Sequence, residues 1–306
     1  MIKVQNLTKY YSDKLAISDL NFQINKGEVV GLLGLNGSGK TTTIRMLSGF
    51  LIPNEGEVWI DDLNSFSDPI EIKRKVGYLP ETPPLYEDLT IRDYLEFVAR
   101  IKSVSNIESE IKRVCEVTNL MDVIDQYISH LSLGFRKRVG IAQAILGFPK
   151  IVIMDEPISG LDPRQIVEIR HLIRNLSKEH TVLLSSHILS EVYLVCDRFI
   201  FIHEGKLVYD CSRVDLEKEM QKISELQIGL RGNSKEECKS FLENIIQNVE
   251  VKLLEENKDY YLFGVRPENL DSYRDKLLFN LTGKGFKLEL LKKEDITLEQ
   301  FFIDRI

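Results

Sequence analysis

Residues 34–41 read GLNGSGKT and match the phosphate-binding pattern G-x-x-x-x-G-K-[ST]. The glycines of this stretch let the backbone wrap closely around a phosphate, because glycine places no Cβ in the way. Backbone N–H groups at the start of a helix attract such an anion. Lys40 adds a cation for the outer phosphates, and the Thr41 hydroxyl can ligate Mg²⁺. The motif predicts a nucleoside triphosphate site built from Gly34, Leu35, Asn36, Gly37, Ser38, Gly39, Lys40, Thr41 and Thr42.

A second group of reactive side chains follows two apolar runs further along the chain. The run IVIM leads into Asp155 and Glu156, and the run TVLL is followed by two serines and His187. Adjacent residues at a strand end point to different sides. We therefore expect Asp155 to hold Mg²⁺ and Glu156 to act as general base toward an attacking water. His187 is expected beside the γ-phosphate or that water. The other histidines are expected to be structural: His130, His171, His180 and His203.

The elements that must position these residues can be read from the hydrophobic pattern. The phosphate motif lies between a short apolar run and a helical pattern, which is the strand–loop–helix order that a phosphate loop needs. Runs that are apolar on both faces alternate with helical segments, which indicates a parallel sheet covered on both sides. Residues 90–147 read mostly as helix, and residues 197–210 read as a hairpin that turns at Glu204 and Gly205.

A different pattern occupies the last part of the chain. From residue 225 to 294 the predicted order is strand, helix, strand, strand, helix, strand, which is typical of a ferredoxin-like α+β unit. Thr297 with Gln300 predicts a capped terminal helix. We predict an α/β domain with a mixed sheet core over residues 1–215, with a helical subdomain at about 84–145, and an accessory α+β domain over 222–306. The accessory domain is expected to make subunit contacts, and a regulatory ligand site or a stabilising cap remain open.

Composition narrows the class of protein. The chain has 306 residues and a formal net charge of −7, which disfavours a nucleic-acid scaffold. None of the four cysteines is spaced C-x-x-C, so zinc and redox motifs are not expected. The apolar stretch VGIAQAILGF is about half as long as a bilayer span requires. We expect no membrane-spanning segment, so that any attachment to a membrane goes through a partner.

Taken in order, these motifs resemble those of the ATP-binding subunits of ATP-binding cassette (ABC) transporters. The resemblance covers roughly residues 1–215 and implies a P-loop NTPase fold of the ABC type. It is carried by Tyr11, the phosphate loop at 34–41, YLPE ending at Glu81, LSLGF from Leu131, the Asp155-Glu156 pair, SGLD ending at Asp162, and His187.

The resemblance implies further roles and partners. Tyr11 is expected to stack on adenine, with Tyr10 as the fallback. Ser132 and Gly134 of the signature are expected to act in trans, on ATP held by a second ATPase subunit in a homodimer or heterodimer. Asp162 is expected to cross the dimer seam. The implied cofactors are ATP and Mg²⁺, and the implied location is the cytoplasmic face of the cell membrane, through an integral membrane permease.

Two departures from the family pattern are visible. The family signature reads LSGGQ, whereas this chain has Leu133 and Phe135 at the third and fifth positions. Glu81 stands where the family has glutamine, and its carboxylate can still ligate Mg²⁺. Both departures resemble the subgroup that pairs with ABC-2-type exporter permeases, which favours export. The basic run 136–138 is predicted to be a solvated or subunit-facing patch rather than a nucleic-acid site.

Two alternative functions remain open from the sequence. The first is a soluble ABC-type ATPase that acts on ribosomes or DNA. It is disfavoured by the single phosphate loop and by the lack of sustained heptads between Lys40 and Asp155. The second is a regulatory subunit that binds ATP without hydrolysing it, which the departures at Glu81, Leu133 and Phe135 suggest.

Overall fold

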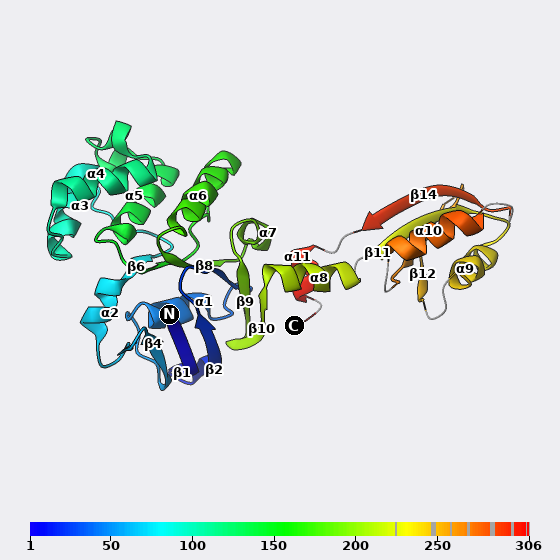
Figure 1. Ribbon diagram of the computed structural model, residues 1–306, viewed down its shortest axis with the longest axis horizontal. Helices are drawn as coiled ribbons and strands as arrows, with labels where there is room; N and C mark the ends of the chain where they lie inside the picture. Colours follow the sequence, from blue (N-terminus) through cyan, green and yellow to red (C-terminus); the bar gives the residue numbers. More distant parts are fainter. Residues whose placement is uncertain are drawn as a thin grey trace. The chain divides into compact units, whose positions relative to one another are not determined.

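The computed structural model describes residues 1–223, 225–245, 249–257, 259–267, 270–281, 285–294, 297–303 and 305. The chain divides into two compact units, Met1–Arg213 and Val214–Ile306 (Figure 1). The motifs with predicted chemistry all lie in the first unit.

The first unit is built on two sheets. An antiparallel sheet has the strand order β2-β1-β4-β5. Its strands are β1 (Ile2–Tyr11), β2 (Lys14–Ile24), β4 (Glu55–Ile60) and β5 (Leu63–Asn64). A six-stranded sheet has the order β10-β9-β3-β8-β7-β6. Its strands are β3 (Val29–Leu33), β6 (Val76–Leu79), β7 (Ile151–Met154), β8 (Thr181–Ser186), β9 (Arg198–His203) and β10 (Lys206–Ser212).

The second of these sheets carries the predicted strand ends. All of its neighbouring strands pair in parallel except β10, which pairs antiparallel with β9. Every residue of β3, β7 and β8 is buried, which confirms the prediction of a sheet covered on both faces. The β9–β10 hairpin is also confirmed. Because the parallel strands run in one direction, the residues that follow β3, β7 and β8 meet at one edge.

Seven α-helices and two short 3₁₀ turns, η1 (Met121–Val123) and η2 (Ile128–His130), complete the described first unit. The helices are α1 (Lys40–Leu47), α2 (Pro69–Lys75), α3 (Ile91–Ile101), α4 (Ile107–Thr118), α5 (Leu133–Ile145), α6 (Pro163–Leu176) and α7 (Leu189–Tyr193). The helical prediction for residues 90–147 is confirmed by α3, α4 and α5, which lie together in Figure 1. Side chains of Thr90 and Asn106 cap α3 and α4.

Helix α1 belongs to the main hydrophobic core. One cluster joins Ile2 of β1 and Leu32 of β3 to Ile44, Met46 and Leu47 of α1, all fully buried. Apolar side chains from both sheets therefore pack around this helix. Burial on several sides holds the first turn of α1 in place, and that turn contains Lys40 and Thr41 of the phosphate motif.

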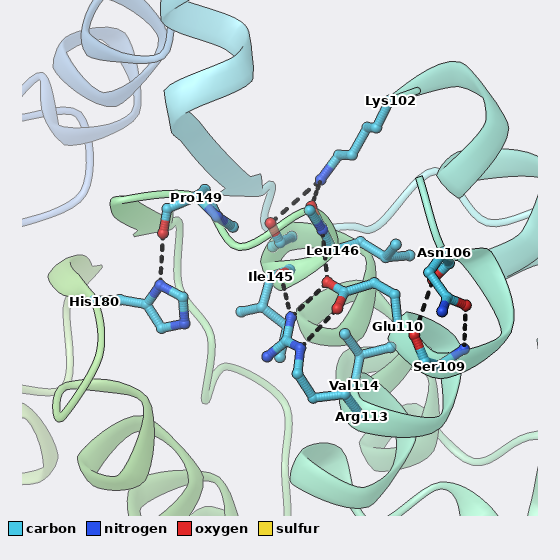
Figure 2. A network of polar contacts seen from close by, with 12 residues as sticks. Lys102, Asn106, Ser109, Glu110, Arg113, Val114, Ile145, Leu146, Pro149 and His180 are labelled. Carbon is cyan, nitrogen blue, oxygen red and sulfur yellow. Dashed lines mark hydrogen bonds and ion pairs between the residues drawn. The ribbon is translucent and has the colours of Figure 1, made fainter. Parts of the chain in front are cut away.

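The far end of α5 is held by a network of polar contacts with α3 and α4 (Figure 2). Lys102 Nζ donates to three carbonyl oxygens there, those of Gln143 (2.7 Å), Ala144 (3.3 Å) and Leu146 (2.9 Å). Glu110 accepts from the Gly147 N–H at 2.8 Å and pairs with Arg113. The Lys102 ammonium thus occupies carbonyls that a helix C-terminus leaves without intrahelical partners.

The second unit contains an antiparallel sheet with the order β12-β13-β11-β14. Its elements are α8 (Arg213–Ile223), β11 (Glu225–Arg231), α9 (Lys235–Glu243), β12 (Val251–Glu256), β13 (Tyr261–Val265), α10 (Leu270–Leu281), β14 (Lys287–Glu294) and α11 (Leu298–Ile303). The predicted βαββαβ order is confirmed. Its core includes Ile228, Leu230 and Tyr273, and the Tyr273 hydroxyl donates to the Leu242 carbonyl at 2.8 Å.

The terminal helix begins as predicted. The backbone N–H of Gln300 donates to Thr297 Oγ1 at 3.1 Å, and Leu298, Phe301 and Phe302 are buried. Across the described parts of both units, no helix combines the length and the apolar character that a membrane span requires.

Candidate functional site

The phosphate motif forms a loop between buried strand β3 and helix α1. Gly34 is required by close packing, because a Cβ there would lie 2.2 Å from the Ile202 carbonyl oxygen. Gly39 precedes α1 with φ of 108°, a conformation that side-chain-bearing residues rarely adopt. Lys40 Nζ donates to the carbonyls of Gly34 (2.8 Å) and Leu35 (3.1 Å). The lysine is therefore folded back over its own loop.

Burial lowers the pKa of Lys40, and three nearby carboxylates act in the opposite direction. These belong to Glu156, Asp155 and Glu81, in order of decreasing effect. The sequence-predicted lysine and carboxylates are thus electrostatic neighbours, although they come from distant parts of the chain.

A cavity of about 1040 Å³ opens over this loop. The predicted residues that line it are Tyr11, Leu35, Asn36, Gly37, Ser38, Gly39, Lys40, Thr41, Thr42, Glu81, Glu156 and His187. The volume is at the upper end of the range for small-molecule sites. Asp155 is almost fully buried and lies behind the lining, beside Thr41.

The two adjacent carboxylates have different surroundings. Asp155 Oδ1 accepts from the Ser185 hydroxyl at 2.6 Å and from the Thr41 hydroxyl at 3.4 Å. Glu156 Oε2 lies 2.8 Å from His187 Nδ1, and the Glu156 N–H donates to Ser185 Oγ at 3.0 Å. Asp155 therefore faces the phosphate loop, while the side chain of Glu156 pairs with His187 and lines the cavity.

The oxygen donors beside Lys40 suit Mg²⁺. Thr41 Oγ1 and Asp155 Oδ1 are close enough to face one ion, and Glu81 offers a further carboxylate on the cavity wall. Mg²⁺ is typically held by one or two carboxylates together with water and substrate phosphates. Within the described residues, no group of three or more His, Cys, Asp or Glu side chains could hold a metal alone. The donor set therefore fits an ion completed by phosphate oxygens.

Sequence reasoning missed one wall of the cavity. Its other lining residues are Lys14, Leu15, Ala16, His203, Glu204 and Lys206. The β9–β10 turn is held against the phosphate loop, because the Gly205 N–H donates to the Ser38 carbonyl at 2.9 Å and its carbonyl accepts from the Ser18 N–H at 2.8 Å. His203, which was expected to be structural, thus lines the cavity. The glycine at the hairpin turn was the only signal, and it does not reveal what the turn contacts.

The predicted signature and seam residues lie elsewhere. Ser132 is exposed and caps α5, with its hydroxyl oxygen 3.5 Å from the Phe135 N–H. Gly134 is buried, and a Cβ there would lie 2.7 Å from the Gln165 side chain. Asp162 caps α6 by accepting from the Gln165 N–H at 2.9 Å. The structure therefore brings Gly134 and Asp162 to Gln165, and none of Ser132, Gly134 and Asp162 lines the cavity over Lys40.

The prediction of a solvated or subunit-facing basic patch at residues 136–138 is wrong for two of its three members, which are buried within the chain itself. Only 2% of Lys137 and 8% of Arg138 is exposed. Lys137 Nζ donates to the carbonyls of Glu81 (2.6 Å) and Glu156 (3.0 Å). Arg138 bonds the Thr118 carbonyl and Glu168. Consecutive helix positions point in different directions, and α5 is packed on most of its faces, so a run of like charges does not mark a surface here.

Comparison with known proteins agrees with this geometry. The family model described as "ABC transporter" matches residues 17–159. The chain is 36% identical to the bacitracin transport ATP-binding protein BcrA of Bacillus licheniformis, over 100% of this chain and 97% of that one. It is also 36% identical to the lantibiotic transport ATP-binding protein SrtF of Streptococcus pyogenes, over 69% of this chain and 90% of that one.

Solved structures with the same fold include dimers. An ATP-binding subunit of an ABC transporter superposes with a TM-score of 0.65 at 32% identity, covering 72% of this chain and 92% of that one. The ATP-binding cassette MJ0796, in a dimeric post-hydrolysis state bound to ADP and Pi, gives a TM-score of 0.64 at 26% identity, covering 70% of this chain and 99% of that one.

Proposed function

Because the chain belongs to the ABC transporter family of ATP-binding subunits, we propose that it powers export through a separate ABC-2-type membrane permease. The family places it among ATPases that drive transport. Relatives named for bacitracin and lantibiotic transport favour this function over action on ribosomes or DNA, and they make peptide antibiotics the first class of cargo to test. The proposed location is the cytoplasmic face of the membrane, bound to the permease.

One observation carries the assignment of the active site. Lys40, the Thr41–Asp155 contact and the Glu156–His187 pair converge at the same cavity from three segments of the chain. Hydrolysis of a bound nucleoside triphosphate uses a cation, oxygen ligands for Mg²⁺ and a residue that positions or deprotonates the attacking water. All three are within reach of the backbone N–H groups at the start of α1, which attract an anion.

The proposed roles follow from these contacts. Lys40 leaves its own loop carbonyls to bind the outer phosphates of ATP. Thr41 and Asp155, with Glu81 nearby, hold Mg²⁺, which neutralises phosphate charge when bound. Glu156 accepts a proton from the attacking water, and His187, paired with Glu156, steadies the γ-phosphate.

The rest of the ATP site is proposed to come from a second ATPase subunit, identical or not. Ser132 caps an exposed helix start, outside the cavity over Lys40, so it is free to meet a phosphate held by another chain. Gly134 follows it, and Asp162 is proposed to lie at the seam. Tyr11 is half exposed on the cavity wall and is proposed to stack on adenine, with neighbouring Tyr10 as the alternative.

The test of this function is a Glu156→Gln variant of the full-length chain. The amide keeps the size of the side chain but cannot accept the proton, so turnover should fall by about 10²-fold or more while MgATP still binds. Glu179→Gln changes an exposed carboxylate away from the cavity and serves as the matched control. Phosphate release and nucleotide binding should be measured on both. Near-normal turnover by Glu156→Gln removes the general-base assignment.

A further inference from the structure

Lys137 of α5 has no part in the proposed chemistry, yet it touches the backbone of two residues that do. Its ammonium is buried and donates to the Glu156 carbonyl at 3.0 Å and to the Glu81 carbonyl at 2.6 Å. Lys137 itself is not among the residues that line the cavity. The lysine therefore contacts the site through the backbone carbonyls of Glu81 and Glu156.

Glu156 needs such support because its backbone is unusual. Its φ is 48°, in the left-handed region that residues with side chains rarely adopt. Conformations of this kind persist only where the surrounding contacts determine them. Here the Glu156 N–H donates to Ser185 Oγ, and the Glu156 carboxylate pairs with His187. The Glu156 carbonyl accepts from Lys137 Nζ at 3.0 Å and from the Ser159 N–H at 3.3 Å. Lys137 thus supplies one of four contacts that hold Glu156 with its carboxylate on the cavity wall.

The same ammonium also ties Glu156 to the segment that carries Glu81. Both residues line the cavity, and β6 and β7, which precede them, are neighbouring strands. Burial lowers the pKa of Lys137, while nearby carboxylates raise it. These are Glu81, Glu156 and Asp155. Lys137 is thus a buried cation that offsets part of the extra negative charge that Glu81 brings in place of a glutamine.

We propose that Lys137 is a positioning residue for ATP hydrolysis, which holds the backbone of Glu156 in its left-handed conformation and fixes it to the Glu81 segment. This inference rests on the proposed role of Glu156 as general base. Lys137 lies five residues after Ser132 on the same helix, about 7.5 Å along its axis. A phosphate bound by the start of α5 in trans is thereby connected through one rigid helix to the base of this chain's own site.

The experiment compares two substitutions at Lys137 with one at a second lysine of the same kind. Lys137→Met keeps the length of the side chain and removes both hydrogen bonds. Lys137→Gln restores uncharged N–H donors on a shorter side chain. Lys102→Met is the matched control, because Lys102 also donates to α5-end carbonyls but lies away from the cavity. The readouts are kcat and KM for ATP, the Kd for MgATP, and thermal unfolding, all on the full-length chain.

A displacement of about 1 Å at a reacting group costs about 10²-fold in rate. We expect kcat of Lys137→Met to fall by about that factor, with the Kd for MgATP within about threefold of the wild type. The kcat of Lys137→Gln should lie between those of the wild type and Lys137→Met, about tenfold below the wild type. Lys102→Met should lower the unfolding temperature while leaving kcat within about twofold.

The outcomes separate the inference from the function on which it rests. Wild-type kcat in Lys137→Met, or a loss of kcat no larger than that of Lys102→Met, overturns the positioning role. If Lys137→Met does not fold, Lys137→Gln decides, since wild-type kcat in that variant also overturns the role. Glu156→Gln is measured in the same series. If Glu156→Gln is inactive while Lys137→Met is active, the positioning role of Lys137 alone is overturned. If Glu156→Gln is active, the general-base assignment is overturned.

Discussion

Replacing Ser185 by alanine tests whether one hydroxyl holds both the Asp155 carboxylate and the backbone of Glu156. Ser185 is fully buried at the end of β8. Its Oγ donates to Asp155 Oδ1 at 2.6 Å and accepts from the Glu156 N–H at 3.0 Å. The Ser185→Ala variant removes both contacts and leaves a buried N–H without its acceptor. We expect a loss of stability together with a loss of catalytic rate.

The expected magnitude follows from these two bonds. A hydrogen bond to a charged group contributes about 1.5–3 kcal/mol, and a buried polar group left without a partner costs about 1–3 kcal/mol. Because Asp155 still accepts from the Thr41 hydroxyl, the two effects are partly offset. We expect the free energy of unfolding to fall by about 2–4 kcal/mol. Ser186→Ala is the matched control, because Ser186 is equally buried but accepts only from the Ile188 N–H, at 2.9 Å.

Urea unfolding can be followed by the fluorescence of Trp59, the single tryptophan, which lies in β4 of the first unit. Ser186→Ala should lose about 1 kcal/mol. Of the two variants, Ser185→Ala should change the ATPase rate and its dependence on Mg²⁺ concentration, because Ser185 bonds Asp155 and Glu156 whereas Ser186 bonds the Ile188 N–H. An unfolding free energy for Ser185→Ala within about 0.5 kcal/mol of the control, or an unchanged Mg²⁺ requirement, refutes the reasoning.

Two further predictions concern Lys102, which lies away from the cavity, and Tyr11, which lines it. Burial lowers the pKa of Lys102 from 10.5 to about 8. Between these two pH values the unfolded chain binds a proton at Lys102 that the folded chain lacks. The protein therefore becomes more stable as pH rises through this range. The difference in unfolding free energy between the wild type and Lys102→Met should therefore grow by about 2 kcal/mol from pH 7 to pH 9.5, and a flat difference contradicts the shift. Tyr11→Ala should raise the Kd for MgATP by about three- to tenfold with kcat unchanged, as expected for a lost aromatic contact. If Tyr10→Ala has this effect instead, the adenine contact is one residue earlier.

The elements and the cavity residues with strong local patterns were predictable from the sequence. Buried strands β3 and β7 are short runs without polar side chains, β8 contains the apolar run VLL, and each strand is followed by a reactive group. Because parallel strands end at one edge, their sequence order was enough to bring Lys40, Glu156 and His187 into one cavity.

Contacts that depend on packing direction were not predictable. Lys137 belongs to a basic run that reads as a surface, and only the packing of α5 shows that its ammonium reaches the Glu156 carbonyl. Ser185 precedes His187 in an ordinary polar pair, and its bonds to the Asp155 carboxylate and the Glu156 N–H depend on the register of β8 beside β7. The β9–β10 turn was predicted, but its docking on the phosphate loop depends on the sheet order.

The arrangement of α5 bears on the two departures in the signature. Leu133 and Phe135 are exposed at the start of the helix, whereas Lys137 is buried one turn later against the Glu156 carbonyl. Substitutions at the exposed positions change the surface at the start of α5 without touching the contacts that hold Glu156. On the proposed mechanism, Leu133 and Phe135 therefore tune the strength of ATP-driven dimerisation, and the chemical step stays with Glu156. A chain whose signature departs from the family pattern can thus remain an ATPase as long as the buried part of the same helix is intact.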